Sequence, residues 1–319
     1  MFDFLRVFLT ALSLRVCVCG SPAIARVNAA GGTWRAARNA RFDKVSVDEA
    51  RVLLGALPDS DYDEAASKVA KAQSALEATA GRVKAGDIPA SFDARDAFPG
   101  CVHAIRDQGQ CGSCWAFSAS EALSDRFCIA TNGTDNVVLS PEQLVSCDWE
   151  GNMGCNGGML RFAWDYMEVF GLVPDDCFPY TAGGGNAPQC PLSSTCADGT
   201  TKWGDVRHSV KALSTKHYTS VEAAQAAIMA DGPIQVAFNV PQSFMSYKDG
   251  VYQCDSSVYL GGHAVKAVGW GTDSDSGEDY WLIANSWGSD WGIDGFFKIT
   301  RGTNACGIEA QMFAGLPKV

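Results

Sequence analysis

The residues best suited to chemistry stand in a short run, QGQCGSCWAF, at positions 108–117. Gly109 and Gly112 interrupt regular structure, whereas residues 115–130 are rich in Ala and Leu and lack Pro and Gly, which predicts a helix. Cys114 would then lie in the first turn of that helix. Because the unpaired backbone N–H groups and the helix dipole at this end favour a thiolate over a thiol, the sequence predicts a nucleophilic sulfur.

A thiol nucleophile needs a base, and the chain has only four histidines. His263 opens an apolar strand pattern in the run GGHAV, and Asn285 follows it in the run NSWG. An asparagine oxygen can accept a hydrogen bond from one imidazole nitrogen and leave the other for the sulfur, while the ring of Trp287 would shield that bond from water. The order of Cys114, His263 and Asn285 therefore predicts a nucleophile, its base and a residue that orients the base.

Together these runs resemble the papain family of cysteine proteases, both in the cysteine signature and in the order of histidine and asparagine. The resemblance implies peptide-bond hydrolysis through a thioester on Cys114, without a cofactor. It also makes Gln108 the side-chain donor of an oxyanion hole, beside the Cys114 backbone N–H. The implied fold is α+β and papain-like, with a helical domain packed on a β-barrel-like domain and the active-site cleft between them.

Cysteine and histidine also serve redox and metal sites, and Cys111 with Cys114 matches a thioredoxin-like spacing. No βαβ pattern surrounds this pair, however, and the cysteine spacings lack the two closely spaced pairs of a zinc module. We therefore expect no metal site, and we expect His103, His208 and His217 to be surface or structural residues. An inactive or transpeptidating homologue that binds peptides is the alternative, although all four expected catalytic residues are present.

Helical patterns dominate the first half of the mature chain and strand patterns the second. Helices are expected at 115–130, from 141, at 159–170 and at 220–231, and strands at 234–240, 250–253, 263–270, 279–285 and 295–300. Ser140 would cap the second of these helices, and Gln143 would close a capping box. This order predicts an α+β protein of two packed domains, in which Cys114 and His263 meet at the seam.

The cysteine content indicates an oxidising compartment. Of 13 cysteines, Cys17 and Cys19 fall in the expected leader, and the eleven that remain make five pairs and one free thiol. Spacing alone leaves the connectivity open, but the resemblance implies five bridges and a free Cys114. The implied pairs are Cys101 with Cys128, Cys111 with Cys155, Cys147 with Cys190, Cys177 with Cys196, and Cys254 with Cys306.

The first 87 residues divide into an expected leader and an expected pro-segment. Residues 1–25 carry an early arginine, an apolar run and a small-residue ending, which is typical of a secretory signal peptide. Residues 26–87 contain WRAARNARF at 34–42, LLG at 53–55 and a helical stretch at 61–83, and they resemble the short propeptide of the cathepsin B branch. We interpret them as an inhibitory propeptide that lies in the cleft, rather than as a flexible linker or a helical hairpin.

The peptidase domain is expected at 88–319, with a mainly helical half at 88–205 and a mainly β half at 206–319. Residues 1–87 hold 12 Lys and Arg against 10 Asp and Glu, whereas residues 88–319 hold 13 against 26, a net charge of −13. Such an acidic domain is a poor partner for nucleic acid or anionic lipid, and no run is long and apolar enough to span a membrane. The slight positive charge of the propeptide suggests that acid, by protonating carboxylates at the contact, loosens it.

The leader and the resemblance together imply where the protein works. We expect a monomer of the secretory pathway that reaches a lysosome, a lysosome-like vacuole or the outside of the cell. Its expected partners are protein and peptide substrates, its own propeptide and cystatin-type inhibitors. Asn132, followed by Gly and Thr, is an acceptor for N-glycosylation in a polar loop context.

The resemblance also predicts how a substrate is held. Its backbone would lie against Gly157 and Gly158, which allow a close approach. In cathepsin B an occluding loop carries adjacent histidines that hold the free carboxylate of the substrate, but here the twelve residues between Cys177 and Cys190 contain no histidine. The sequence therefore predicts an endopeptidase with little dipeptidyl-carboxypeptidase activity.

The main specificity pocket receives the side chain two residues before the cut. By resemblance its walls would be Leu160, Ala237 and Ala264, with Gln311 at the floor where cathepsin B has a glutamate. Glu309 is the weaker candidate for a charge at this place. Because a neutral amide does not offset the desolvation of a guanidinium, we expect a preference for Phe, Leu or Val over Arg.

Overall fold

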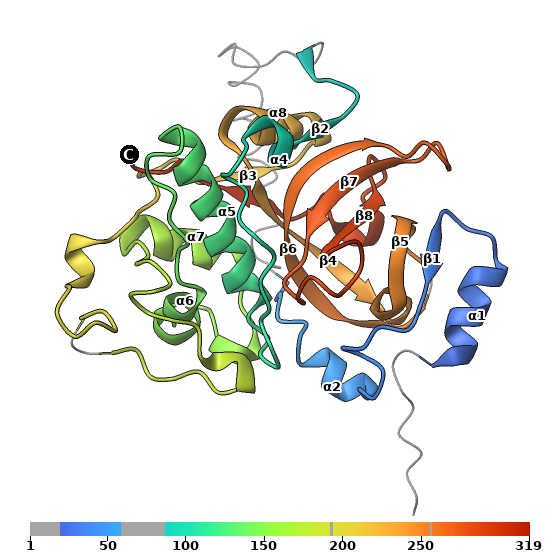
Figure 1. Ribbon diagram of the computed structural model, residues 1–319, viewed down its shortest axis with the longest axis horizontal. Coiled ribbons are helices and arrows are strands. Elements are labelled where there is room, and N and C mark those ends of the chain that lie inside the picture. The colour runs from blue at the N-terminus through green and yellow to red at the C-terminus, as the bar shows by residue number, and fades with distance from the viewer. Residues whose placement is uncertain (1–19, 59–86, 192–193, 256) are drawn as a thin grey trace, which may run out of the picture.

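The computed structural model of the 319-residue chain describes residues 20–58, 87–191, 194–255 and 257–319 (Figure 1). The expected leader falls largely on residues 1–19, and the expected helix at 61–83 falls on residues 59–86, so both predictions lie outside the described residues. The first described helix, α1 (Ser21–Ala29), runs across the expected end of the leader at residue 25.

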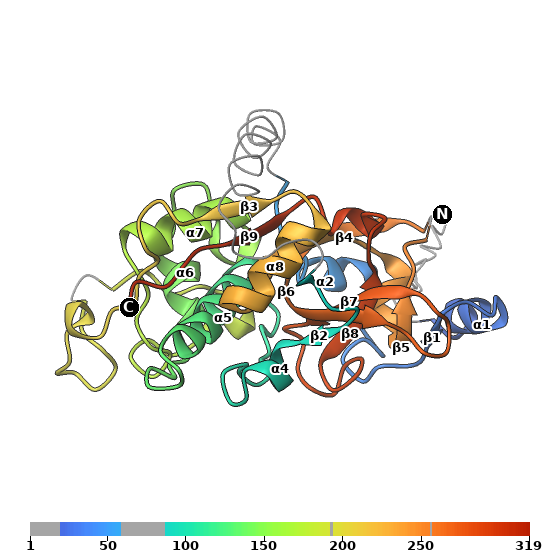
Figure 2. The same cartoon turned by 90° about the horizontal axis from the view of Figure 1, so that it is seen from above.

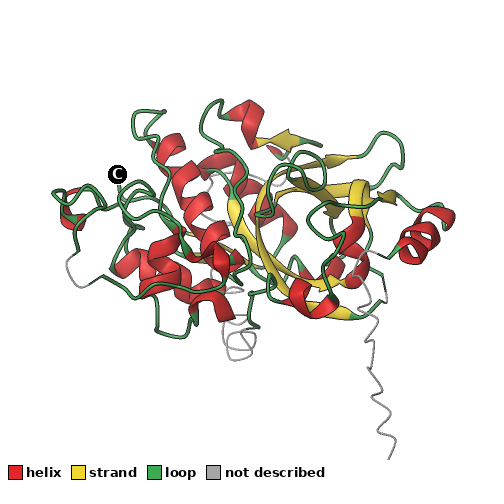
Figure 3. Ribbon diagram, turned by 60° about the horizontal axis from the view of Figure 1, so that its bottom comes forward, coloured by secondary structure: helices red, strands yellow, loops and turns green. Residues whose placement is uncertain are grey.

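Helices gather in one half of the molecule and strands in the other (Figures 1 and 3). The helical half contains α5 (Cys114–Ala130), α6 (Pro141–Cys147) and α7 (Leu160–Val169). The other half contains α8 (Val221–Asp231), β4 (Ile234–Pro241), β5 (Tyr247–Tyr252), β6 (Tyr259–Thr272), β7 (Asp279–Ala284) and β8 (Phe296–Thr300). The sequence predicts each of these elements to within a few residues of its observed ends, and the expected α+β class is confirmed.

Helix α5 lies at the centre of the fold. It packs against α6 and α7 on one side and against β4 and β6 on the other, so nearly all of its side chains are buried. The Ala, Phe and Leu residues of α5 provide much of this buried surface, and several polar side chains of the helix are buried with hydrogen-bond or ion-pair partners. Its buried Arg126 donates hydrogen bonds to the carbonyls of Gly232, Pro233 and Gly315. These contacts make α5 a rigid support for the residue at its first position.

The strand order of the sheet is β1-β5-β8-β7-β6-β4-β9-β3, with β2 beside β6. β4 and β6 pair antiparallel, and α8 packs against both of these strands and against α5 (Figure 2). The sequence analysis does not predict four short strands, β1 (Trp34–Ala36), β2 (Phe92–Asp93), β3 (Lys216–Tyr218) and β9 (Met312–Ala314). With two or three residues each, they are too short to show an alternating pattern, and only their partners define them.

The core of the β half is largely aromatic. Phe244 contacts the rings of Tyr247, Tyr252, Trp291 and Phe297, with centroids 4.9 to 6.0 Å apart. Aromatic pairs at such separations add to the free energy gained by burying their apolar surface. This cluster supports the strands that carry the candidate site.

Five disulfides link the pairs that the resemblance implies, and Cys114 is the free cysteine among the described residues. Four of the bridges lie in the helical half, where much of the chain is loop. The fifth joins Cys254 to Cys306 in the β half. Cross-links of this kind stabilise a loop-rich region chiefly by restricting its unfolded state.

The start of α6 differs from the expected capping box. Ser140 Oγ accepts a hydrogen bond from the Gln143 backbone N–H at 3.1 Å, as the motif requires. The Gln143 side chain does not return the bond, because its Nε2 donates to the Gly171 carbonyl and its Oε1 accepts from the Val173 N–H. The buried main chain after α7 needs hydrogen-bond partners, and Gln143 supplies them.

The first part of the expected propeptide that the structure describes, up to residue 51, lies mainly on the β half. β1 pairs antiparallel with β5, and Trp34 packs edge-on against Tyr252 with centroids 4.9 Å apart. Helix α2 (Val47–Arg51) begins after Ser46, whose side chain forms a capping box with Glu49. These are the contacts of a folded segment and not of a flexible linker.

Candidate active site

Cys114 is the first residue of α5, and its side chain is buried. Its Sγ accepts a hydrogen bond from the backbone N–H of Ala264, on β6, at 3.4 Å. The expected nucleophile of the helical half therefore lies directly against the β half.

His263 lies on β6, and its Nε2 is 2.7 Å from Oδ1 of Asn285, the residue that follows β7. Since an amide oxygen can only accept, Nε2 carries the imidazole proton and Nδ1 keeps its lone pair. Nδ1 is buried and has no hydrogen-bond partner within the described part of the chain. The Trp287 ring stacks on the imidazole, with centroids 4.6 Å apart, and so covers this pair.

The Gln108 side chain is buried next to these residues. Its Nε2 donates to the Leu53 carbonyl at 3.0 Å and to the Cys111 carbonyl at 2.7 Å. Its Oε1 accepts from Ser286 Oγ at 2.7 Å, which determines which end of the amide is the donor. The sequence analysis does not single out Ser286, although its place directly after Asn285 is a signal that could have found it.

Residues 53–57 of the pro-segment cross between the two halves. The Ala56 N–H donates to the Gly262 carbonyl and the Leu57 N–H to the Gly158 carbonyl, both at 3.0 Å. The Gly158 N–H donates in turn to the Gly55 carbonyl at 2.8 Å. One stretch of chain is thus bonded to both halves, and it occupies the backbone groups of Gly158 that are expected to hold a substrate.

Gly55 approaches the loop before α5 very closely. A Cβ atom at this position would lie 1.8 Å from the carbonyl oxygen of Gly112, far inside any real contact distance. The Gly55 backbone N–H also bonds the sulfur of Cys114. Only glycine allows the pro-segment to pass the nucleophile at this distance.

Arg41 makes a second contact between the pro-segment and the site. Its Nη1 bonds both carboxylate oxygens of Asp107 at 2.7 Å and the Trp287 carbonyl at 3.2 Å, while Nη2 donates to the Gly109 carbonyl at 2.8 Å. Phe42 packs edge-on against the Trp287 ring, with centroids 5.2 Å apart. The pro-segment therefore contacts both the loop before α5 and Trp287, the residue that covers the imidazole of His263.

Burial sets the ionisation of the covered site. Loss of hydration raises the pKa of the Cys114 thiol to about 11, and hydrogen bonds from backbone N–H groups oppose this shift only in part. Burial also lowers the pKa of His263 to about 4; the hydrogen bond to Asn285 opposes the shift, and the charge of Arg41 adds to it. Both shifts favour the neutral thiol and the neutral imidazole while the pro-segment covers the site.

Three of the four residues expected in the specificity pocket lie together. Ala237 of β4 pairs with Ala264 of β6, and its backbone N–H donates to the Gln311 carbonyl at 3.1 Å. Leu160 is buried at the start of α7, in the helical half.

Glu309, the alternative pocket charge, is fully engaged elsewhere. Its carboxylate accepts hydrogen bonds from Trp281 Nε1 at 3.0 Å, Gly302 N at 2.6 Å and Asn304 N at 2.8 Å. A carboxylate with three N–H donors has little capacity left for a substrate guanidinium.

The other three histidines each have a hydrogen-bond partner outside the candidate site. These are Asp125 for His103, Asp135 for His208 and the Ala310 carbonyl for His217. Among the residues that the structure describes, no group of three or more His, Cys, Asp and Glu side chains could hold a metal ion. Within the same ranges, no helix has the length and apolar character needed to cross a bilayer.

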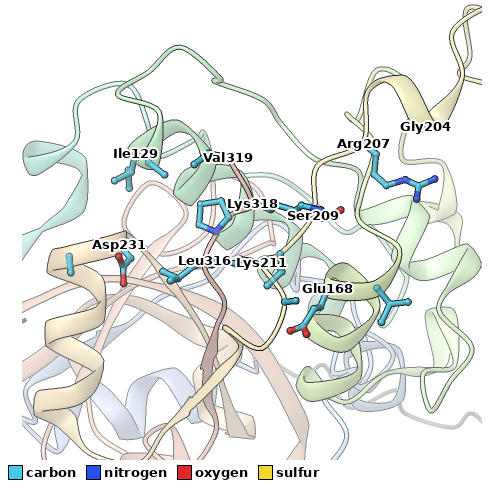
Figure 4. A pocket seen from close by; sticks show the side chains of 16 residues that line it. Ile129, Glu168, Gly204, Arg207, Ser209, Lys211, Asp231, Leu316, Lys318 and Val319 are labelled. Atoms are coloured by element: carbon cyan, nitrogen blue, oxygen red, sulfur yellow. The ribbon is translucent and has the colours of Figure 1, made fainter. Parts of the chain in front are cut away.

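A separate cavity of about 1030 Å³ lies between the C-terminal ends of α5, α7 and α8 and the C-terminal tail (Figure 4). Charged residues of both signs line it, among them Glu168, Lys211 and Asp231. It contains none of the residues expected in the active site, and its mixed charge favours no single ligand chemistry. This cavity is therefore not the candidate active site.

The comparisons with known proteins agree with this geometry. The model of the papain family cysteine proteases matches residues 88–316, and the chain belongs to that family. Within the family it is cathepsin B-like. It is 42% identical to Cathepsin B-like CP2 of Giardia intestinalis over 284 residues, which are 88% of this chain and 89% of that protein. It is 43% identical to Cathepsin B-like cysteine proteinase 4 of Caenorhabditis elegans over 260 residues, 73% of this chain and 76% of that protein.

Solved structures of inactive precursors share the fold. ProCathepsin B S9 from Trypanosoma congolense is 31% identical with a TM-score of 0.80, and the match covers 95% of this chain and all of that one. Procathepsin L2 from the larval midgut of Tenebrio molitor is 28% identical with a TM-score of 0.72, covering 92% of this chain and 87% of that one. Both resemblances extend over the pro-segment as well as the peptidase domain.

Proposed function

We propose that this cathepsin B-like protease is the zymogen of an endopeptidase with Cys114 as nucleophile, His263 as base, Asn285 as the residue that orients the base, and Gln108 as an oxyanion donor. The main support is the hydrogen bond from Gln108 Nε2 to the Leu53 carbonyl at 3.0 Å. A peptide carbonyl of the chain itself thus accepts a hydrogen bond from the amide that we propose as the donor to a substrate oxyanion.

The mechanism follows from these roles. Departure of the pro-segment exposes the site to water, which lowers the thiol pKa and raises the imidazole pKa, so the proton moves from Cys114 to His263. The thiolate attacks the scissile carbonyl carbon, and the oxyanion accepts hydrogen bonds from Gln108 Nε2 and the Cys114 N–H. His263 then protonates the leaving amine, and it later activates the water that hydrolyses the thioester.

Substrates would bind along the path of the pro-segment. Gly157 and Gly158 pair with the substrate backbone, and Trp287 shields the imidazole. The side chain two residues before the cut enters the pocket of Leu160, Ala237 and Ala264, above Gln311. Because Gln311 is neutral and Glu309 is engaged by three N–H groups, the pocket prefers Phe, Leu or Val to Arg.

We further propose the following processing. Residues 1–25 direct the chain into the secretory pathway, residues 26–87 inhibit the enzyme, and residues 88–319 form the peptidase, with a helical half to about residue 205. Asn132 is exposed in the turn after α5 and is accessible to glycosylation. The mature enzyme is a monomer of a lysosome, a vacuole or the extracellular space, where cystatin-type proteins inhibit it and acid loosens its own propeptide.

The absence of histidine between Cys177 and Cys190 favours internal cutting over removal of C-terminal dipeptides. The experiment is a product map: acid-activated protein and a Cys114→Ala control act on free-C-terminus peptides near pH 5, and mass spectrometry locates the cuts. Internal cuts one residue after Phe, Leu or Val, absent from the control, are expected. Stepwise loss of C-terminal dipeptides would contradict the endopeptidase, amine adducts would favour transpeptidation, and intact peptides would favour a binding protein.

A further inference from the structure

The hydroxyl of Tyr180 bridges two parts of the candidate site. Tyr180 lies in the long loop of the helical half, and its Oη donates to the Gln108 backbone carbonyl at 2.8 Å. The same oxygen is 2.9 Å from Ser113 Oγ. A phenol has one hydroxyl proton, and Tyr180 uses it in the hydrogen bond to the Gln108 carbonyl. Ser113 Oγ is therefore the donor in the hydrogen bond to the Tyr180 oxygen. One oxygen thus joins the main chain of Gln108 to the residue directly before Cys114.

Ser113 gives up its usual role to make this bond. It occupies the N-cap of α5, where a serine side chain normally accepts from a backbone N–H of the first turn, but no such bond is present. The side chain is fully buried and points instead to Tyr180. A side-chain cap of this kind stabilises a helix, so its absence at Ser113 indicates that the hydrogen bond to Tyr180 serves another purpose.

The Tyr180 loop is itself held firmly. Glu142, a fully buried residue of α6, accepts hydrogen bonds from the backbone N–H groups of Thr181 at 2.5 Å and Ala182 at 2.9 Å. The Gly183 carbonyl accepts from the Gln110 N–H at 2.7 Å. The Tyr180 loop therefore contacts the run before Cys114 at two residues, Gln108 and Gln110. The buried carboxylate of Glu142 fixes this loop to α6.

We propose that Tyr180 is a positioning residue of the oxyanion hole. Its hydroxyl sets the spacing between the two donors, Gln108 Nε2 and the Cys114 N–H, by holding the main chain on either side of them. This inference rests on the proposed function and adds a residue to it. Donors in an oxyanion hole are effective when they are preorganised around the developing charge. A small shift in their spacing therefore reduces the stabilisation of the transition state more than it reduces the affinity for the substrate.

The test is Tyr180→Phe, which removes the oxygen and keeps the ring that packs edge-on against Phe117 at 4.6 Å. In the acid-activated full chain we expect kcat to fall by about tenfold, as for the loss of one or two neutral hydrogen bonds, with KM changed by less than about twofold. Affinity for a peptide aldehyde, whose hemithioacetal oxygen occupies the oxyanion hole, should fall in parallel. The pH profile for alkylation of Cys114 by an uncharged reagent should not move.

Tyr166→Phe is the matched control, because its hydroxyl accepts a hydrogen bond from Gln143 Nε2 at 3.1 Å, away from the oxyanion donors. Ser113→Ala should reproduce the effect of Tyr180→Phe, and the double variant should be no worse than either single one. If wild-type protein is inactive, the proposed function fails. If wild-type protein is active and Tyr180→Phe behaves like Tyr166→Phe, or loses aldehyde affinity and alkylation rate together, the inference about Tyr180 is wrong.

Discussion

The reactivity of the Cys114 thiol depends on whether the pro-segment covers it. In the zymogen its pKa is raised to about 11 by burial, so only about one thiol in ten thousand is ionised at pH 7. The pKa of His263 is lowered to about 4, so the imidazole gives the thiolate no positive partner at that pH.

We therefore predict a large change in alkylation on activation. The rate with a small uncharged alkylating reagent should rise only above about pH 9 in the zymogen, and should already be high near pH 5 in the mature enzyme. The measurement is the second-order rate constant between pH 4 and 10, with Cys114→Ala as the blank. Superimposable profiles for the two forms would contradict the effect of burial on the pKa of Cys114.

Gln311 is the residue that should decide between apolar and basic substrates. Gln311→Glu places a carboxylate at the pocket floor, so kcat/KM for a peptide with Arg two residues before the cut should rise at least about tenfold relative to its Leu counterpart. Gln311→Leu is the control and should leave Arg disfavoured. The ratio is measured with paired peptides that differ at this residue alone, and an unchanged ratio would place the floor of the pocket elsewhere.

At the scale of elements, a buried ion cluster joins α5 to β6 behind the site. Lys266 Nζ of β6 is 2.6 Å from Asp125 Oδ2 and 3.7 Å from Glu121 Oε2, both on α5, and all three side chains are buried. Removing Lys266 would take the ion-pair partner from the buried Glu121 and would leave Asp125 with His103 as its remaining partner in the core.

Lys266→Met should therefore lower the free energy of unfolding by about 3–5 kcal/mol. Lys298→Met is the matched control: Lys298 pairs with Asp273 at 2.7 Å and its side chain is 25% exposed, so its loss should cost clearly less than the loss of Lys266. Urea unfolding with disulfides intact measures both. Equal midpoints for the two variants would show that the buried cluster does not hold the halves together.

Local pattern predicts the long elements well, because their side chains repeat over several turns or strand residues. It fails where a distant partner decides. The capping box at Gln143 satisfies the local rule, yet the amide is taken by Gly171 and Val173, which come much later in the chain. Cys114 and His263 can be found from their neighbours, whereas the contacts of Ser286 and Tyr180 with Gln108 exist only after folding.

At the scale of the whole molecule, the pro-segment contacts the peptidase through ion pairs that should contribute very differently to its binding. Arg41 is largely buried and bonds Asp107 and two carbonyls, whereas the Arg35 side chain is 76% exposed and pairs with Asp249. Exposed ion pairs contribute little because water screens them.

In a free propeptide, Arg41→Ala should weaken inhibition of the mature enzyme by about tenfold or more, and Arg35→Ala by less than about threefold. Inhibition by the unsubstituted propeptide should weaken as the pH falls from 7 to 4, because acid reduces the attraction between a slightly basic segment and an acidic domain. Inhibition constants measured over this range test both statements. A flat response to pH would refute acid release, and equal effects of the two substitutions would refute the role of Arg41.

The contact between Gly55 and Gly112 has a consequence for inheritance. Most changes in an enzyme gene subtract activity and are recessive. Here one added methyl group, Gly55→Ala, would meet a main-chain oxygen of Gly112, so residues 53–57 could not keep their place beside Cys114. Under the proposed inhibitory role of this segment, one altered copy would supply unrestrained protease beside the normal precursor, so we expect mutation of Gly55 to be dominant.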